Sequence, residues 1–290
     1  MQLLRLRYVL IFGLTALLAG GLSWGLPQFA IAQDPPTPFE QHRSDLPVPS
    51  PQLAIAPAVP VDSQSVTYGT LYGRPSVGFL ARPADAEGPL PALIVIHEWW
   101  GLNENIKAMT EKLAGEGYTA LAVDLYGGKV AETPDRAREL VTAARENPDA
   151  LRDNLRDAYR YLEEEENAPT IASIGWCFGG TWSLNTALLF PEQLDAAVIY
   201  YGGGIETDPE KLKTLEMPIL GIFGELDDNP SPETAREFES TLKDLGKSVD
   251  VYIYENADHA FANPSGTRYN PEAAADASER TLEFLNRHLK

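Results

Sequence analysis

The only cysteine in this chain of 290 residues stands where it could act as an activated nucleophile. Cys177 lies in the segment Gly175-Trp-Cys-Phe-Gly-Gly180, between a predicted buried strand and a predicted helix. The pattern G-x-C-x-G has the form of a nucleophile elbow, with sulfur in place of the usual serine oxygen. Glycines on both sides avoid collisions in the sharp turn, and the N-terminus of the following helix favours a thiolate. A lone cysteine is more often a buried structural residue, but this setting favours the nucleophile.

A thiol nucleophile needs a base, and the chain has four histidines. On an elbow of this kind, the acid and the base follow the nucleophile in the chain. His259 follows a predicted strand, lies in a loop and precedes the last predicted helix, so it is the expected base. The other three histidines are His42 in a proline-rich segment, His97 on a strand before the nucleophile, and His288 at the end of the last helix.

The acid that orients the base should follow the preceding strand. Phe223-Gly-Glu-Leu-Asp-Asp-Asn-Pro230 offers two carboxylates there, and the G-x-x-D spacing from Gly224 favours Asp227 over Asp228. Asp258 is a weaker alternative because adjacent residues rarely aim their side chains at each other. Cys177, His259 and an aspartate would together perform acyl transfer.

A third group of residues ends the strand 92–97. The segment His97-Glu-Trp-Trp-Gly-Leu-Asn103 lies where a loop can supply a backbone donor to an oxyanion hole. We expect the donors to be the N–H groups of Trp99 and Phe178. The two tryptophans could also form a hydrophobic lid or core, and both interpretations are compatible because an apolar wall excludes water.

Alternating strands and helices must position these groups. Apolar runs rich in β-branched residues predict strands buried on both faces, and segments with helical spacing lie between them. This alternation predicts an α/β fold with a mostly parallel, doubly wound sheet and helices on both faces. The expected strands are 66–72, 77–82, 92–97, 118–123, 170–175, 196–200, 218–223 and 249–254, and the expected helices are 103–116, one beginning at 149, 178–189, 234–245 and 272–288.

The N-terminal part of the chain is predicted to lie outside this domain. Two arginines, an apolar run over 8–26 and an A-x-A site predict a signal peptide over residues 1–32, with an uncleaved membrane anchor as the alternative. Eight prolines between residues 33 and 60 predict a semi-rigid tether over 33–64 rather than an arm packed on the domain. The domain itself is expected over 65–290, outside the cytoplasm.

Charge excludes some partners. With 23 Lys and Arg against 42 Asp and Glu, the net charge is -19, and loss of Arg5 and Arg7 with the signal peptide makes it -21. Such a polyanion repels nucleic acid and anionic membrane surfaces, so only residues 8–26 could tether it to a membrane. One cysteine excludes an intrachain disulfide and a thiolate metal cluster. Nothing in the sequence demands a metal or organic cofactor; the oligomeric state is open, with a monomer favoured.

Five motifs in order make the chain from residue 66 to 290 resemble the dienelactone hydrolase family of α/β-hydrolases. They are H-E-W-W-G-L-N at 97–103, D-L-Y at 124–126, G-W-C-F-G-G at 175–180, G-E-L-D at 224–227 and D-H-A-F at 258–261. The resemblance implies an α/β-hydrolase fold and a triad of Cys177, His259 and Asp227. It also implies that Glu98 contacts the thiol and helps to switch it between thiol and thiolate. Trp100, Tyr126 and Phe261, each from one of these motifs, are assigned to the substrate pocket.

The chain departs from the family at two arginines that hold the substrate carboxylate in dienelactone-cleaving members. Gly127-Gly-Lys129 and Asn263 stand at these places, and no motif places Lys129 or Arg268 as a substitute. We therefore expect an exported hydrolase of a carboxylic ester or lactone other than dienelactone. The alternatives are an α/β-hydrolase scaffold that binds a ligand without turnover, and a redox-sensing thiol.

Overall fold

The structure is a computed structural model that describes residues 40–48 and 50–290. The predicted signal peptide and the first part of the predicted tether lie outside these residues. Within the described ranges, no helix combines the length and the apolar character needed to cross a bilayer.

An eight-stranded sheet organises the described residues. Its spatial order is β1-β2-β4-β3-β5-β6-β7-β8. The pairs β1–β2 and β2–β4 are antiparallel, whereas β4, β3 and β5 to β8 run parallel. The strands are β1 Val61–Leu71, β2 Arg74–Pro83, β3 Ala92–Ile96, β4 Thr119–Val123, β5 Ile171–Trp176, β6 Ala196–Tyr200, β7 Ile219–Gly224 and β8 Val249–Tyr254.

The central strands are those that the sequence predicts as continuous apolar runs. Every residue of β3, β4, β5, β6 and β7 is buried. Such strands have no face that tolerates water, so helices must cover both sides of the sheet. The prediction of a mostly parallel sheet covered on both faces is confirmed.

The helices begin at side-chain caps that their sequences supply. Asn103, Thr133, Ser231 and Asn270 each accept a hydrogen bond from a backbone N–H of the first helical turn. The helices are α1 Glu104–Gly115, α2 Pro134–Arg145, α3 Pro148–Arg160, α4 Phe178–Leu189, α5 Pro209–Leu212, α6 Pro232–Asp244 and α7 Pro271–Leu289, with 3-10 turns η1 Glu40–His42 and η2 Pro51–Ala54 and a π turn η3 Tyr161–Glu165 after α3.

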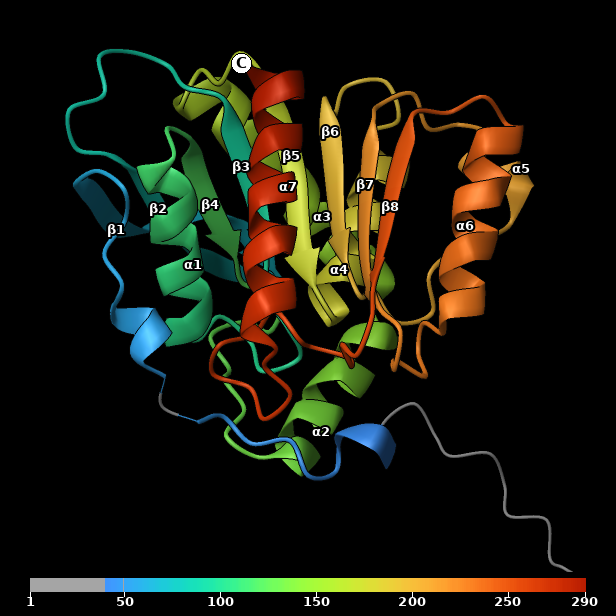
Figure 1. Ribbon diagram of the computed structural model, residues 1–290. Coiled ribbons are helices and arrows are strands. Elements are labelled where there is room, and N and C mark those ends of the chain that lie inside the picture. The colour runs from blue at the N-terminus through green and yellow to red at the C-terminus, as the bar shows by residue number, and fades with distance from the viewer. Residues whose placement is uncertain (1–39, 49) are drawn as a thin grey trace, which may run out of the picture. The chain divides into compact units, whose positions relative to one another are not determined.

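The sheet divides the core into two layers. On one face, α1 and α7 pack on alternate residues of the central strands, such as Leu93 and Val95 of β3. On the other face, α2, α3, α4 and α6 pack on the intervening residues, such as Ile94 and Ile96. Figure 1 shows α1 and α7 in front of the sheet and α3 and α4 behind it. The strict alternation follows from the two-residue period of a strand.

Two parts of the structure differ from the prediction. Helix α2 was not expected, although Thr133 caps it, Pro134 opens it, and its buried residues Ala137, Leu140, Val141 and Ala144 have helical spacing. The described part of the proposed tether packs on the domain: β1 begins at Val61, and the Lys112 Nζ donates to the Gln52 carbonyl at 2.6 Å. Prolines exclude a helix there, but they do not prevent an extended segment from packing against a surface.

The carboxyl ends of the parallel strands meet at one edge of the sheet. There β3 leads into His97, β5 into Cys177, β7 into Asp227, and β8 into His259. Figure 1 shows this edge at the bottom of the view, with residues 40–48 running beneath it. Ligands bind in this position in open α/β sheets.

Candidate active site

Cys177 occupies a strained turn between β5 and α4. Its backbone has φ 55° and ψ -117°, a conformation that side chains rarely adopt. A Cβ on Gly175 would lie 2.1 Å from the Gly179 carbonyl oxygen, and one on Gly179 would lie 2.2 Å from the Ile96 carbonyl oxygen. The turn is therefore possible only with glycine at both positions, and it holds the thiol at the start of α4.

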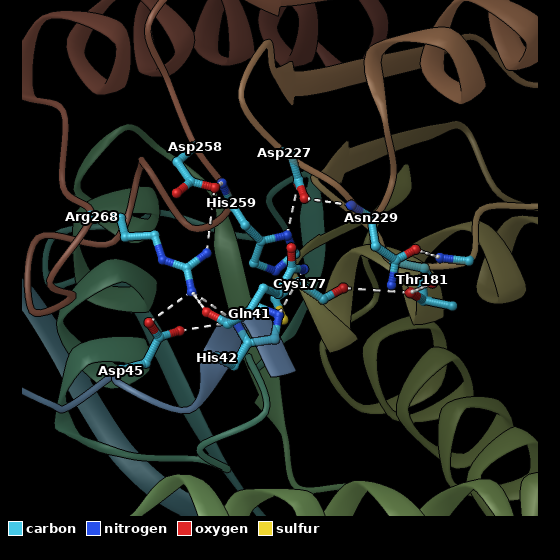
Figure 2. A network of polar contacts seen from close by, with 12 residues as sticks. Gln41, His42, Asp45, Cys177, Thr181, Asp227, Asn229, Asp258, His259 and Arg268 are labelled. Carbon is cyan, nitrogen blue, oxygen red and sulfur yellow. Dashed lines mark hydrogen bonds and ion pairs between the residues drawn. The ribbon is translucent and has the colours of Figure 1, made fainter. Parts of the chain in front are cut away.

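Asp227 and His259 form a buried pair beside this thiol. His259 Nδ1 donates to Asp227 Oδ2 at 2.7 Å, and the exposed fractions of the two residues are 2% and 1%. The second oxygen of Asp227 accepts the backbone N–H of Asn229 at 2.8 Å. In Figure 2, His259 lies between Asp227 and Cys177. Asp228 is exposed, so the structure brings together the residues that the sequence favoured.

Beside a charged Cys177, the surroundings of His259 favour its protonated form, so the ring can hold a proton that the thiol gives up. Burial lowers the pKa of His259, but the negative charges of Asp227 and Cys177 and the hydrogen bond to Asp227 outweigh it and hold this pKa well above the usual value. Nε2 has no hydrogen-bond partner among the described residues. It is therefore free to exchange a proton with a group at the thiol.

The loop after β3 is fixed by His97. Its Nδ1 donates to the Glu98 carbonyl at 2.6 Å, and its Nε2 accepts the Leu125 N–H at 3.2 Å. Its ring stacks on Phe178, with centroids 5.7 Å apart. Burial lowers the pKa of His97, which agrees with a neutral ring that accepts at Nε2. His97 thus positions the two segments that carry the expected oxyanion donors, Trp99 and Phe178.

The N–H groups of these two residues remain available. Phe178 is the first residue of α4, so its N–H has no acceptor within the helix. The Trp99 N–H has no acceptor among the residues that the structure describes.

Glu98 is a buried carboxyl group beside the thiol. It is 3% exposed, and both Glu98 and Cys177 line one small cavity. Burial is the main cause that raises the pKa of Glu98 to about 7. Asn263 Nδ2 donates to Oε2, whereas Oε1 has no partner among the described residues. A group with this pKa can hold or release a proton near neutral pH.

The three predicted pocket residues have different surroundings. Trp100 lines the cavity at Cys177 and His259. Burial is the main cause that raises the pKa of Tyr126, and the charge of a nearby Cys177 thiolate raises it further. Two cavities reach Cys177, and Tyr126 lines neither of them. Phe261 is 0% exposed, belongs to the core layer that α7 covers, and lines neither cavity that reaches Cys177. The adjacent Ala260, which the sequence did not single out, lines the cavity instead.

The sequence analysis missed residues of the proline-rich segment. His42 and Asp45 line the same cavity as Cys177 and His259, and so does Arg268 of the loop after β8. The only local signal was the presence of ionisable side chains among prolines, which is weak. Lys129, the other cation considered, is exposed. No group of three or more His, Cys, Asp or Glu side chains in residues 40–48 and 50–290 is arranged to hold a metal ion.

Comparison with known proteins agrees with this fold. Carboxymethylenebutenolidase of Pseudomonas putida is 29% identical over 227 residues, covering 76% of this chain and 91% of that protein. Protein usf of Aquifex pyrophilus is 35% identical over 221 residues, covering 73% and 93%. The crystal structure of a dienelactone hydrolase-like promiscuous phosphotriesterase from metagenomic libraries has a TM-score of 0.72 at 22% identity, covering 79% of this chain and 99% of that one, and it shows the shared fold.

The model of the dienelactone hydrolase family matches residues 77–289, which is more than half of the chain. The match contains the elbow at Cys177, the Asp227–His259 pair and the loop after β3. It leaves out β1, the turn η2 and the segment that carries His42. This chain therefore belongs to the dienelactone hydrolase family and is a hydrolase with the α/β-hydrolase fold.

Proposed function

We propose that this protein hydrolyses a carboxylic ester or lactone by acyl transfer through Cys177. One observation carries the proposal: the buried Asp227–His259 pair leaves Nε2 unpartnered beside a thiol that a strained turn presents. A base with a free nitrogen next to a nucleophile is the arrangement that covalent catalysis requires.

In the first step, the sulfur of Cys177 attacks the carbonyl carbon. His259 Nε2 takes the thiol proton, and Asp227 holds the ring so that Nε2 faces the sulfur. The N–H groups of Trp99 and Phe178 stabilise the oxyanion, and removing one such donor typically costs about 3 kcal/mol of transition-state stabilisation. When the carbon–oxygen bond breaks, His259 returns the proton to the departing alkoxide and a thioester remains.

In the second step, water hydrolyses the thioester. His259 Nε2 accepts a proton from the attacking water and then returns it to the leaving sulfur, so the thiol is restored and the acid is released. Glu98, whose pKa of about 7 lets it change charge near neutral pH, biases the resting thiol against the thiolate. An ester suits this site better than an amide because an alkoxide leaves more readily than an unprotonated amine.

We propose a substrate without a carboxylate beside the reacting carbonyl. Asn263 donates to Glu98 and accepts from the Ser265 backbone at 2.9 Å, so its amide is already engaged. Arg268, the cation that lines the cavity, is paired with Asp45 at 2.8 Å. While this pair is closed, no Lys or Arg among the described residues of the cavity that Cys177 shares with Glu98 and Arg268 is left to pair with a substrate anion, and a neutral ester fits better than dienelactone.

The test is a panel of neutral and carboxylate-bearing esters and lactones incubated with the full-length protein. We expect hydrolysis of neutral substrates to fall at least about 10³-fold in Cys177→Ala and in His259→Ala. His288→Ala, a histidine at the end of α7, is the matched control and should keep the wild-type rate. Equal rates in wild type and Cys177→Ala, or no turnover of any substrate, would contradict the proposal.

We also propose that residues 1–32 direct export. The support is the order of basic, apolar and small residues in that segment. N-terminal sequencing of the protein recovered outside the cytoplasm should begin near Gln33; an intact N-terminus in a membrane fraction would indicate an anchor instead.

A further inference from the structure

A short segment before the family's matched region lies over the catalytic residues. We call Gln41–Val48 the arm. It runs beneath the carboxyl ends of the strands in Figure 1 and contributes residues to the cavity at Cys177. The family model begins at residue 77, so the arm is an addition to the part of this chain that the family shares.

His42 is the arm residue that approaches the catalytic groups. Its ring meets the His259 ring edge-on, with centroids 4.7 Å apart, and lies 5.0 Å from the Trp99 ring. It is 7% exposed. The ring is therefore packed between the general base and the loop that carries an oxyanion donor.

With the arm in this position, little space remains at the thiol. His42 lines two cavities that both reach Cys177, and their volumes are about 20 Å³ and about 40 Å³. On this measure a cavity of roughly 10–15 Å³ holds one water. An ester brings an acyl group and an alkoxy group to the sulfur, and together these need more room than a few waters.

Polar contacts to Arg268 and to the loop after β8 attach the arm to the domain. Asp45 Oδ1 accepts from Arg268 Nη2 at 2.8 Å, and Asp45 Oδ2 accepts from His42 Nδ1 at 2.9 Å. Arg268 also donates to the Gln41 carbonyl and, at 3.4 Å, to Asp258, the residue before His259. Figure 2 shows this network beside the catalytic residues. A backbone hydrogen bond from the Val48 N–H to the Ser265 carbonyl at 2.8 Å adds to the attachment.

We propose that the arm is a lid over Cys177, latched by the Asp45–Arg268 pair, and that His42 determines the size of the group that reaches the thiol. Substrates larger than the two cavities react only when the Asp45–Arg268 pair opens. Small substrates reach the thiol after a smaller displacement of the arm. That the arm limits access to Cys177 is argued from the geometry alone. The consequence for ester hydrolysis rests on the proposed function.

Alkylation of Cys177 tests the lid without relying on hydrolysis. Cys177 is the only cysteine of the chain, so every thiol adduct reports on this site. We would measure the rates with iodoacetamide, a small reagent, and with fluorescein maleimide, a bulky one, on the full-length protein. The ratio of the two rates cancels changes in the nucleophilicity of the sulfur and leaves access.

We expect His42→Ala and Asp45→Asn each to raise the bulky-to-small rate ratio at least about tenfold over wild type, because both increase the fraction of open molecules. Ser44→Ala, an exposed residue of the same arm, is the matched control and should leave the ratio unchanged. Circular dichroism would verify that the variants are folded. A ratio that is the same in wild type, His42→Ala and Asp45→Asn would overturn the proposal.

A series of neutral esters with increasing acyl length then tests the consequence for catalysis. In His42→Ala, kcat/KM should rise for long acyl chains relative to acetate at least about tenfold. If the alkylation ratio changes but no ester is hydrolysed, the lid stands and the proposed function fails. If esters are hydrolysed but both the alkylation ratio and the acyl-length preference are unchanged, the lid fails and the proposed function stands.

Discussion

Asp227 and Asp228 are neighbours with the same side chain, and their surroundings give them different roles. Asp227 is 1% exposed, and both of its oxygens accept hydrogen bonds, from His259 and from the Asn229 backbone. Asp228 is exposed to solvent. A carboxylate orients an imidazole only when it is held in this way, so the geometry favours Asp227 for the proposed role.

Replacing Asp227 tests this assignment. Asp227→Asn should lower kcat roughly 10³- to 10⁴-fold, because an amide nitrogen beside Nδ1 favours the wrong tautomer of His259. It should also lower the pKa of His259, since the Asp227 charge raises it. Steady-state kinetics measures the first effect, and NMR titration of His259 the second. The matched control is Asp228→Asn; a comparable loss there would contradict the assignment.

Glu98 shows how burial alone can make an ordinary residue sensitive to pH. Its pKa is about 7 in the folded protein against a usual value of 4.5. Between these two values the folded state retains a proton that the unfolded chain has lost. The free energy of unfolding therefore falls as pH rises from about 4.5 to about 7, and this contribution is constant above that.

Glu98→Gln removes this dependence. Over that pH window, the stability of the wild type relative to the variant should fall by up to roughly 3 kcal/mol, the equivalent of the shift in pKa. Urea unfolding at several pH values measures the difference. Glu104→Gln, in the exposed first turn of α1, should follow the wild-type profile. Parallel profiles for wild type and Glu98→Gln would show that the carboxyl group titrates normally.

The turn between β5 and α4 accepts only certain residues near Cys177, because neighbouring backbone leaves no room for side chains there. Gly175 and Gly179 are required because their Cα atoms approach other backbone atoms; neither glycine has a positive φ. A side chain on Gly175 would push α4 away from β5, and one on Gly179 would push α4 away from β3. The strain at Cys177 is therefore stored by close packing around it.

Gly179→Ala should break this arrangement. Its Cβ would lie 2.2 Å from the Ile96 carbonyl oxygen, so the helix must shift, and we expect a loss of roughly 2 kcal/mol or more of stability together with most of the activity. Chemical denaturation and ester hydrolysis provide the two measurements. Asn185→Ala, a partly exposed position farther along α4, is the control for substitution within the helix. A variant of wild-type stability would refute the packing argument.

Elements also show where prediction from the sequence succeeds. The central strands were predictable because a run of apolar β-branched residues has no stable alternative to burial on both faces. Helix α2 carried its own signals, a Thr-Pro start and apolar residues three and four apart, which went unused. The packing of the arm had no such signal, because Arg268 and Asp45 are separated by 223 positions in the chain.

At the scale of the whole molecule, a neutral core of two layers carries a strongly acidic surface. The net charge of the chain is -19. Exposed ion pairs three residues apart, such as Arg152–Asp149 and Arg156–Asp153, offset part of the repulsion, but each contributes only about 0.3–0.5 kcal/mol. The remaining acidic side chains repel one another and favour the expanded, unfolded chain.

Salt should therefore stabilise the protein. Raising sodium chloride from about 0.01 M to about 0.15 M shortens the screening length from roughly 30 Å to roughly 8 Å, so long-range repulsion falls while short pairs persist. We expect the Tm to rise by a few degrees in a thermal scan, with potassium chloride giving the same result. A Tm that falls with added salt would show that the ion pairs outweigh the net charge.

The sequence by itself determined the order of the strands, the elbow, and the candidates for the nucleophile and the base. These follow from local chemistry: periodicity, glycine spacing and the small number of histidines. Only the tertiary structure decided that Phe261 belongs to the core, that Asn263 donates to Glu98, and that His42 packs against the His259 ring. Each of these depends on which segments, distant in the sequence, meet at the carboxyl edge of the sheet. The spacing of residues along the chain does not contain that information.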